Sequence, residues 1–364
     1  MLEQSSALKL LPLLRGDGVP GPPTHVQVDL VGLSCNHSCN HCYFVQEDRS
    51  HLGKGNERVA AKRNIYPTQD VVRLLVQLHD GDVKAVTFPG GGEPSLHPAF
   101  REIVLAAAEW FKVGLITNLS LPWKTYEGLG KKVAWIRVSL DAANAEAYNA
   151  VHRPKDLKSG GGWDRTVTNI MRLVEEKGKA QTPDIGISYL VAPGQKLVDI
   201  PIAVALAEKL GVTYIQFKPV DDRRQPIKHE VWEKAYHLVE EAATRHGGIR
   251  VINQLGRATK GAYITLQTGY DRGYDRCRFT DYRCDITSDG RMAPCCFLTY
   301  ADKDYNPPPE LPLGAEGART FQEVWASRTN HLIDVQKCPP CQYDAHNLLL
   351  QEFQAVVEAR DSFV

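Results

Sequence analysis

Between residues 25 and 220, short apolar runs alternate with longer stretches in which apolar residues recur at every third or fourth position. Buried strands give the first pattern, and amphipathic helices give the second. The runs predict six strands, at residues 25–32, 84–90, 113–118, 135–141, 185–192 and 212–219. The stretches between them predict helices at residues 68–79, 98–111, 164–176 and 199–210.

Two of these helices carry sequence signals at their first turn. Thr68 is a capping residue type and is predicted to start the first helix. Asp164 is predicted to cap the third helix, with Trp163 just outside it as an apolar staple.

Strand–helix alternation predicts parallel strands joined by right-handed crossovers. The six units fall short of the eight that close a barrel, so we expect an α/β fold, a partial (β/α)6 TIM-like barrel. In such folds the functional residues lie on the loops that follow the strands. Three cysteines follow the first strand, a glycine-rich loop follows the second, and Ser139 and Asp141 end the fourth.

The pattern changes after residue 220. A charged break leads to a predicted amphipathic helix at residues 229–246, and Asp289 and Gly290 then predict a hairpin between residues 285–288 and 291–296. We divide the chain into a lead-in (1–24), the barrel (25–220), a linking helix and strand (221–264), and a small cysteine-rich α+β domain with a C-terminal helix (265–364).

Charge and hydropathy exclude some classes of partner. Lys plus Arg and Asp plus Glu each number 43, so the formal net charge is zero, which argues against a nucleic-acid partner held mainly by charge. No apolar run is long enough to cross a membrane. The apolar patch at residues 8–14 lacks the basic leader and the cleavage site of a signal peptide.

The nine cysteines are clustered, with Cys35, Cys39 and Cys42 on one loop and six more between residues 277 and 341. This odd, uneven set predicts a reducing, cytoplasmic location and metal or cluster binding rather than disulfides. Three thiolates on one loop can hold a cubane iron–sulfur cluster that keeps one iron open. A zinc site completed by His37 or His41 is the alternative.

The loop after the second predicted strand contains Gly91, Gly92 and Glu93. Backbone groups without side-chain shielding, next to a carboxylate, suit an ammonium group better than a phosphate. No Lys-Ser/Thr pair follows, so a nucleotide P-loop is disfavoured.

Together, Cys35-x3-Cys39-x2-Cys42 and Gly91-Gly92-Glu93-Pro94 resemble the motifs of the radical S-adenosylmethionine (SAM) enzyme superfamily. The resemblance covers roughly residues 25–220. It implies a [4Fe-4S] cluster on the three cysteines, with the amino and carboxylate groups of SAM on the open iron. Residues 91–93 would receive that amino group, and the Tyr43 backbone would meet the adenine. The family often has an aromatic residue before the third cysteine, where this chain has His41.

The same resemblance suggests further SAM-binding positions. Ser139 and Asp141 match the family's Ser-x-Asp at the end of the fourth strand, near the ribose and the carboxylate. Other candidates, each of which could equally be a structural polar residue, are Asn118, Arg153, Ser188 and Gln216.

The C-terminal cysteines resemble the twitch domain, a shortened relative of the SPASM domain. This implies a second, auxiliary [4Fe-4S] cluster on Cys277, Cys295, Cys338 and Cys341. A structural zinc ion on the same thiolates is the alternative.

Two cysteines are left over from these sets. Cys284 could replace Cys277 as a cluster ligand, since its spacing to Cys295 is also feasible. Cys296 adjoins a ligand and should point to the opposite side of its strand, as a small buried residue. Either Cys284 or Cys296 could instead donate a hydrogen atom to a substrate radical, as an epimerase requires.

The sequence therefore predicts a radical SAM oxidoreductase that dehydrogenates or epimerises a small polar metabolite, of sugar or aminocyclitol type. An electron donor of flavodoxin or ferredoxin type would reduce it. Modification of a ribosomally made peptide is the first alternative, disfavoured because the 24 residues before the first strand leave no room for a domain that holds a leader peptide. A non-catalytic iron–sulfur carrier or zinc-braced binding protein is the alternative of another class.

Overall fold

The computed structural model describes residues 21–42, 64–156, 162–192, 195–220, 228–256, 272–296, 298–299, 310–328, 333–338, 341, 343–344 and 346–352. Their strands form one sheet in the order β7-β6-β5-β4-β3-β2-β1-β8-β9, parallel throughout except for the antiparallel pair β8–β9. The strands are β1 (His25–Val28), β2 (Ala85–Phe88), β3 (Lys112–Thr117), β4 (Trp135–Ser139), β5 (Asp184–Val191), β6 (Tyr214–Pro219), β7 (Arg250–Asn253), β8 (Arg283–Ile286) and β9 (Met292–Ala293).

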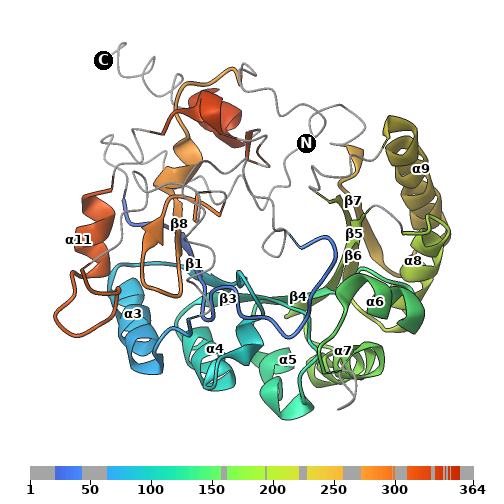
Figure 1. The fold of residues 1–364 in the computed structure, drawn as a ribbon, viewed down its shortest axis with the longest axis horizontal. Helices are drawn as coiled ribbons and strands as arrows, with labels where there is room; N and C mark the ends of the chain where they lie inside the picture. Colours follow the sequence, from blue (N-terminus) through green and yellow to red (C-terminus); the bar gives the residue numbers. More distant parts are fainter. Residues whose placement is uncertain are drawn as a thin grey trace.

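Helices cover one face of this sheet in an arc (Figure 1). They are α3 (Thr68–Asp80), α4 (Phe100–Ala108), α5 (Leu129–Lys132), α6 (Ala145–His152), α7 (Trp163–Lys177), α8 (Asp199–Lys209), α9 (His229–Arg245) and α11 (Phe321–Ala326). Short 3-10 turns lie at η3 (Pro94–Leu96), η4 (Trp123–Thr125), η6 (Arg278–Asp281) and η8 (Val335–Lys337). The α/β partial barrel is confirmed.

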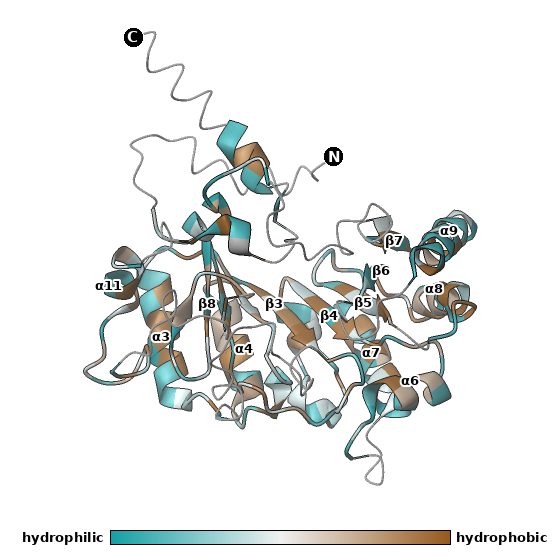
Figure 2. Cartoon of the chain, turned by 45° about the horizontal axis from the view of Figure 1, so that its top comes forward, coloured by the Kyte–Doolittle hydropathy of each residue, from teal (hydrophilic) through white to brown (hydrophobic). Residues whose placement is uncertain are grey.

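The strands are apolar on their helix-facing side and polar on the other. Ile136 and Val138 of β4 lie in the core, whereas Trp135, Arg137 and Ser139 on the alternate positions are only partly buried. Successive side chains of a strand point to opposite faces, so this alternation separates a hydrophobic outer layer from a polar inner face. Figure 2 shows the same separation in α9, which is teal on its outward side and brown toward the sheet.

The start of the first helix at Thr68 is confirmed, but neither Thr68 nor Asp164 caps its helix, and Trp163 is the first residue of α7 rather than a residue outside it. The N-cap of α3 is Pro67 and that of α7 is Gly162, and neither helix has a side-chain cap. Pro67 is extended (ψ 130°), and Gly162 adopts φ +119°, so the backbone already turns before Thr68 and Asp164. Both predicted capping residues therefore lie inside the first turn.

The cysteine-rich region shares the sheet of the barrel. β8 pairs in parallel with β1, so Val26 lies beside Cys284 and Gln27 beside Asp285. The predicted hairpin is confirmed by the β8–β9 pair, and Gly290 takes the left-handed conformation of its turn (φ +72°). No helix among the described residues is long and apolar enough to cross a membrane.

Candidate functional site

The cysteine loop after β1 rests on the C-terminal end of α6. The Ser38 amide donates to the carbonyl oxygen of His152, and the Asn40 amide donates to that of Val151, each over 3.0 Å. The Lys155 amino group donates to the Cys35 carbonyl over 2.9 Å. Helix α6 thus fixes the position of the three thiols.

The glycine-rich loop after β2 packs directly against this cysteine loop. The Glu93 amide donates to the Ser34 carbonyl over 2.8 Å. A Cβ atom added to Gly92 would lie 1.8 Å from that same carbonyl oxygen, which only a residue without a side chain avoids. Gly90 allows the approach through its left-handed conformation (φ +73°).

We expect Gly92→Ala to separate the two loops, destabilising the protein by about 1–3 kcal/mol and weakening SAM binding. The matched control is Gly247→Ala, because a Cβ there would meet nothing within 4 Å. Chemical unfolding and equilibrium binding of SAM to both variants measure the effect. If Gly92→Ala behaved like Gly247→Ala, the packing of the loops would not control the site.

The Glu93 carboxylate braces these loops from inside. Its Oε1 accepts hydrogen bonds from the Ser95 amide (3.1 Å), the Ser95 hydroxyl (2.6 Å) and the Thr117 hydroxyl (2.6 Å), and its Oε2 accepts one from the Asn118 amide (2.7 Å). Burial raises its pKa, and these hydrogen bonds lower it. The carboxylate predicted to face an ammonium ion is therefore engaged by Ser95 of its own loop and by Thr117 and Asn118 at the end of β3.

Asn118 and Asp141 have similar bracing contacts. The Asn118 amide group donates to Asn36 Oδ1 over 2.8 Å, which ties β3 to the cysteine loop. Asp141 has a left-handed backbone (φ +49°), and its Oδ1 accepts a hydrogen bond from the Leu190 amide over 2.7 Å. Its Oδ2 lies 3.5 Å from Nε2 of His41, and this partner lowers the pKa of the carboxyl although burial raises it.

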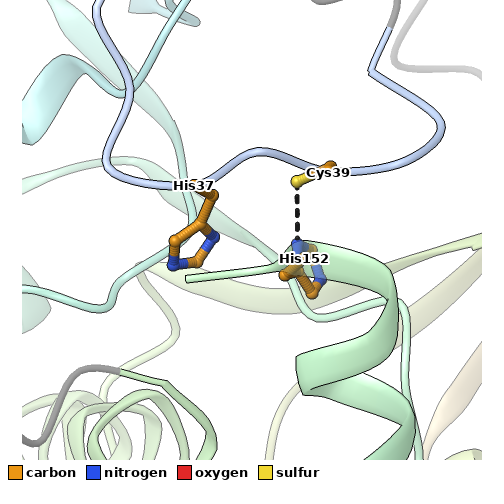
Figure 3. Close-up of side chains that lie close together, drawn as sticks. All are labelled: His37, Cys39 and His152. Carbon is orange, nitrogen blue, oxygen red and sulfur yellow. Dashed lines mark hydrogen bonds between the residues drawn. The ribbon is translucent and has the colours of Figure 1, made fainter. Parts of the chain in front are cut away.

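A buried histidine contacts the middle cysteine of the loop. His152 Nδ1 lies 3.2 Å from Cys39 Sγ, and His37 lies beside them, as Figure 3 shows. Among the described residues, these three form the only group of three potential ligands whose atoms all lie within 4.8 Å of one another.

The spacing of the ligand atoms can be compared with that of a zinc site, the alternative for both sets of cysteines. Zinc would hold its sulfur ligands about 3.8 Å apart, and neither set of predicted cysteine ligands, all of them described, is grouped that closely. His41 lies against Asp141 rather than in the His37–Cys39–His152 group. Burial is the largest cause that raises the pKa of Cys35, to about 12, so cluster binding must release a proton there.

A row of polar side chains crosses the inner face of the sheet. Ser139 of β4 pairs in register with Ser188 of β5, and Ser188 pairs with Gln216 of β6, so all three point to one side. Within the described part of the chain, no hydrogen bond to these side chains is formed, in contrast to Glu93. Their polar groups are therefore available to a ligand on the inner face.

Two predicted positions do not join this row. Arg153 is exposed and ends α6 in the left-handed conformation (φ +46°), with its amide bonded to the Asn149 carbonyl. Tyr43 lies outside the described residues.

The C-terminal cysteines surround a pocket of their own. Cys277, Cys295, Cys338 and Cys341 all line it, and Cys284 and Cys296 do not. The rest of the lining is mostly apolar or aromatic, including Leu298, Ile333, Val335, Tyr274, Phe279 and Tyr343. Burial raises the pKa of all four lining thiols, to about 11 for Cys338 and about 12 for Cys341.

Residues far along the chain hold this pocket. Asn347 donates to Cys277 Sγ over 3.6 Å and accepts from the Phe279 amide over 2.9 Å. Asp344 binds Arg272 over 2.6 Å, and Arg272 donates to the Cys338 carbonyl over 2.5 Å. A buried iron–sulfur cluster requires an apolar lining that excludes water and thiols that are held in fixed positions.

The two remaining cysteines lie apart from each other. Cys284 is 1% exposed and belongs to the helix-facing core, beside Val26. That position does not fit a hydrogen-atom donor or an alternative to Cys277, because it faces away from both the inner face and the pocket. Cys296 is exposed rather than buried, so the prediction that it is a small buried residue is wrong.

Sequence reasoning missed several residues of this site. Asn36 follows Cys35 in the sequence and has no motif of its own. Its contact with Asn118 depends on the packing of β3 against the cysteine loop. His152 and Asn347 lie 113 and 70 positions from their cysteines, so no local pattern joins them. The alternation of buried and partly buried residues in β4 could have identified Arg137, because it places Arg137 on the same face as Ser139.

Comparison with known families identifies the class. Residues 30–207 match the radical SAM superfamily, and residues 277–343 match an iron–sulfur cluster-binding domain of the SPASM type. The chain contains a radical SAM domain and carries a SPASM/twitch iron–sulfur cluster-binding domain at its C-terminus. It is a radical SAM enzyme, a class that needs a [4Fe-4S] cluster and SAM, and its second domain is of a type that binds auxiliary iron–sulfur clusters.

Among solved structures, the chain is similar to SuiB of Streptococcus suis. SuiB bound to S-adenosylmethionine superposes with a TM-score of 0.62 at 16% identity, over 90% of this chain and 69% of that one. SuiB bound to its precursor peptide SuiA gives a TM-score of 0.60 at 16% identity, over 90% and 70%. At this identity the likeness concerns the fold. No curated protein matches the sequence.

Proposed function

We propose that Cys35, Cys39 and Cys42 hold the SAM-binding cluster. The backbone of Gly91 and Gly92 faces the amino group of SAM, since Gly92 lies against Ser34 of the cysteine loop and admits no side chain. The ribose and the rest of SAM lie along Ser139, Ser188 and Gln216. Asn118 and Asp141 act as positioning residues, because their side chains contact Asn36 and His41 of the cysteine loop. Glu93 acts in the same way through the Asn118 amide, which donates to its carboxylate.

The auxiliary cluster is assigned to Cys277, Cys295, Cys338 and Cys341. Support comes from the pocket that these four thiols line, with Asn347 bonded to one of them. The guanidinium of Arg283 of β8 donates to the hydroxyl of the lining residue Tyr343 over 2.7 Å, which connects this pocket to the sheet. The two sites therefore share one side of the sheet.

The reaction we propose is oxidation of a small polar metabolite. Cys35, Cys39 and Cys42 would hold the cluster that supplies the electron for cleavage of SAM to methionine and a radical able to take one hydrogen atom. The four thiols of the C-terminal pocket would hold the cluster that takes up the electron left on the substrate. The substrate also loses one proton, which completes a two-electron dehydrogenation. The polar inner face carries this proposal, because it offers hydrogen bonds to hydroxyl or amino groups of a substrate. A flavodoxin- or ferredoxin-type protein of the cytoplasm supplies the electron that starts the reaction.

Epimerisation of the same kind of substrate needs a hydrogen-atom donor in place of an electron acceptor. Cys296 is the remaining candidate, because it is exposed and close enough to Arg283 and Tyr343 to influence their pKa values.

A second candidate function is modification of a peptide. The fold likeness to SuiB, one of whose structures contains a precursor peptide, favours it.

Deuterium transfer tests these assignments. The reduced protein is incubated with SAM and deuterated candidate substrates, either polar metabolites or peptides. Deuterium in 5′-deoxyadenosine identifies the substrate class, and mass spectrometry of the substrate separates loss of two hydrogens from inversion. Deuterium transfer from peptides alone would contradict the metabolite proposal.

A further inference from the structure

Arg137 stands on the inner face of the sheet, two positions before Ser139 on β4. It pairs in register with Gly186 of β5, which pairs with Tyr214 of β6. Its guanidinium lies 5.6 Å from the ring of Trp135. The arginine thus shares the inner face with the row of Ser139, Ser188 and Gln216 proposed to contact SAM.

The glycines beside Arg137 make room for large aromatic rings. A Cβ on Gly114 would lie 2.2 Å from the Trp135 ring, and a Cβ on Gly186 would lie 2.1 Å from the Tyr214 ring. The two rings therefore lie flat across neighbouring strands, on either side of Arg137. Such a setting removes water from the guanidinium, and burial lowers the pKa of Arg137.

Within the described residues, no carboxylate compensates this charge. Of the acids on the inner face, Asp285 is bound to Arg283 over 2.5 Å, and Asp184 lies 3.9 Å from Arg250. The surroundings of Arg137 are aromatic, with Trp135 beside it and Tyr214 and Tyr343 close enough to act on its charge. A partly buried cation without an anion is unfavourable unless a ligand supplies one.

We propose that Arg137 binds an anionic group of the substrate, a carboxylate or a phosphate, and so orients the substrate below SAM. The proposal rests on the radical SAM function given above. A guanidinium presents two parallel N–H groups that match the oxygens of either anion. Tyr343, which lines the auxiliary pocket, is close enough to influence Arg137, so the anion would lie on the side of the sheet shared by both cluster sites.

The test uses the reconstituted full-length protein, with inorganic phosphate and acetate as separate probes in calorimetric titrations. We expect one or both to bind the native protein at millimolar concentration, and Arg137→Gln to weaken that binding at least about tenfold. The probe that binds more tightly distinguishes phosphate from carboxylate. The matched control is Arg250→Gln, which removes an exposed arginine from the same register row.

Thermal unfolding separates this role from a structural one. Removing a poorly compensated charge should leave Arg137→Gln as stable as the native protein. Failure of both probes to bind the native protein, equal binding by Arg137→Gln, or loss of stability together with binding would each overturn the proposal. Formation of 5′-deoxyadenosine without substrate is read separately: its absence from the native protein would overturn the radical SAM function instead.

Discussion

We expect replacement of Cys35, Cys39 and Cys42 together by alanine to abolish formation of 5′-deoxyadenosine and to remove about four irons per chain. The three thiols are the ligand atoms proposed for the SAM-binding cluster, and a loop fixed by α6 and Gly92 presents them together. Without them SAM has no iron to bind and no electron to cleave it. Anaerobic reconstitution, iron analysis and chromatography of the nucleoside products measure both effects.

Asn40→Ala is the control within the same loop. Its side chain is exposed and lies 3.2 Å from Nδ1 of His41, on the opposite side of that ring from the nitrogen that contacts Asp141, and its backbone bond to Val151 is kept in the variant. We expect full iron content and activity from it. Retained SAM cleavage in the triple cysteine variant would overturn the central assignment.

The second large effect concerns the auxiliary pocket. Replacement of Cys277, Cys295, Cys338 and Cys341 by alanine should lower the iron content from about eight to about four per chain. Reductive SAM cleavage should persist, because the barrel loops are untouched, whereas oxidised product should disappear. Iron analysis and paired assays of 5′-deoxyadenosine and product separate these outcomes.

Cys284→Ala is the matched control, because Cys284 lies in the core and does not line the pocket. We expect it to keep about eight irons and to lose about 1 kcal/mol of unfolding free energy through the small cavity. Four irons and one zinc ion in the native protein would contradict the auxiliary-cluster assignment, as would unchanged iron in the fourfold variant.

The fold and the two motif loops could be predicted because they depend on local patterns. Apolar runs separated by amphipathic stretches specify parallel strands and helices, and the loops after such strands meet at one edge of the sheet. The cysteine loop and the loop of Gly92 are therefore expected to be neighbours, and the bond between Glu93 and Ser34 joins them. The hairpin at Gly290 follows from turn chemistry in the same way.

The sequence does not predict which polar residues point to the inner face of the sheet and which stabilise the loops. Ser188 and Glu93 are both polar residues near strand ends, and only the register and the hydrogen bonds show that Ser188 points to the inner face and that Glu93 braces a loop. The cap predictions failed for a similar reason, since Pro67 and Gly162 occupy the N-cap positions instead of Thr68 and Asp164. The role of Asn347 depends on contacts across 70 positions.

The most direct measurement is the yield of 5′-deoxyadenosine from the native protein, reconstituted without oxygen and reduced in the presence of SAM. We predict 5′-deoxyadenosine and methionine in equal amounts, with no product when the reductant is omitted. Quantitative recovery of intact SAM from a reduced protein that carries its full iron content would contradict the account.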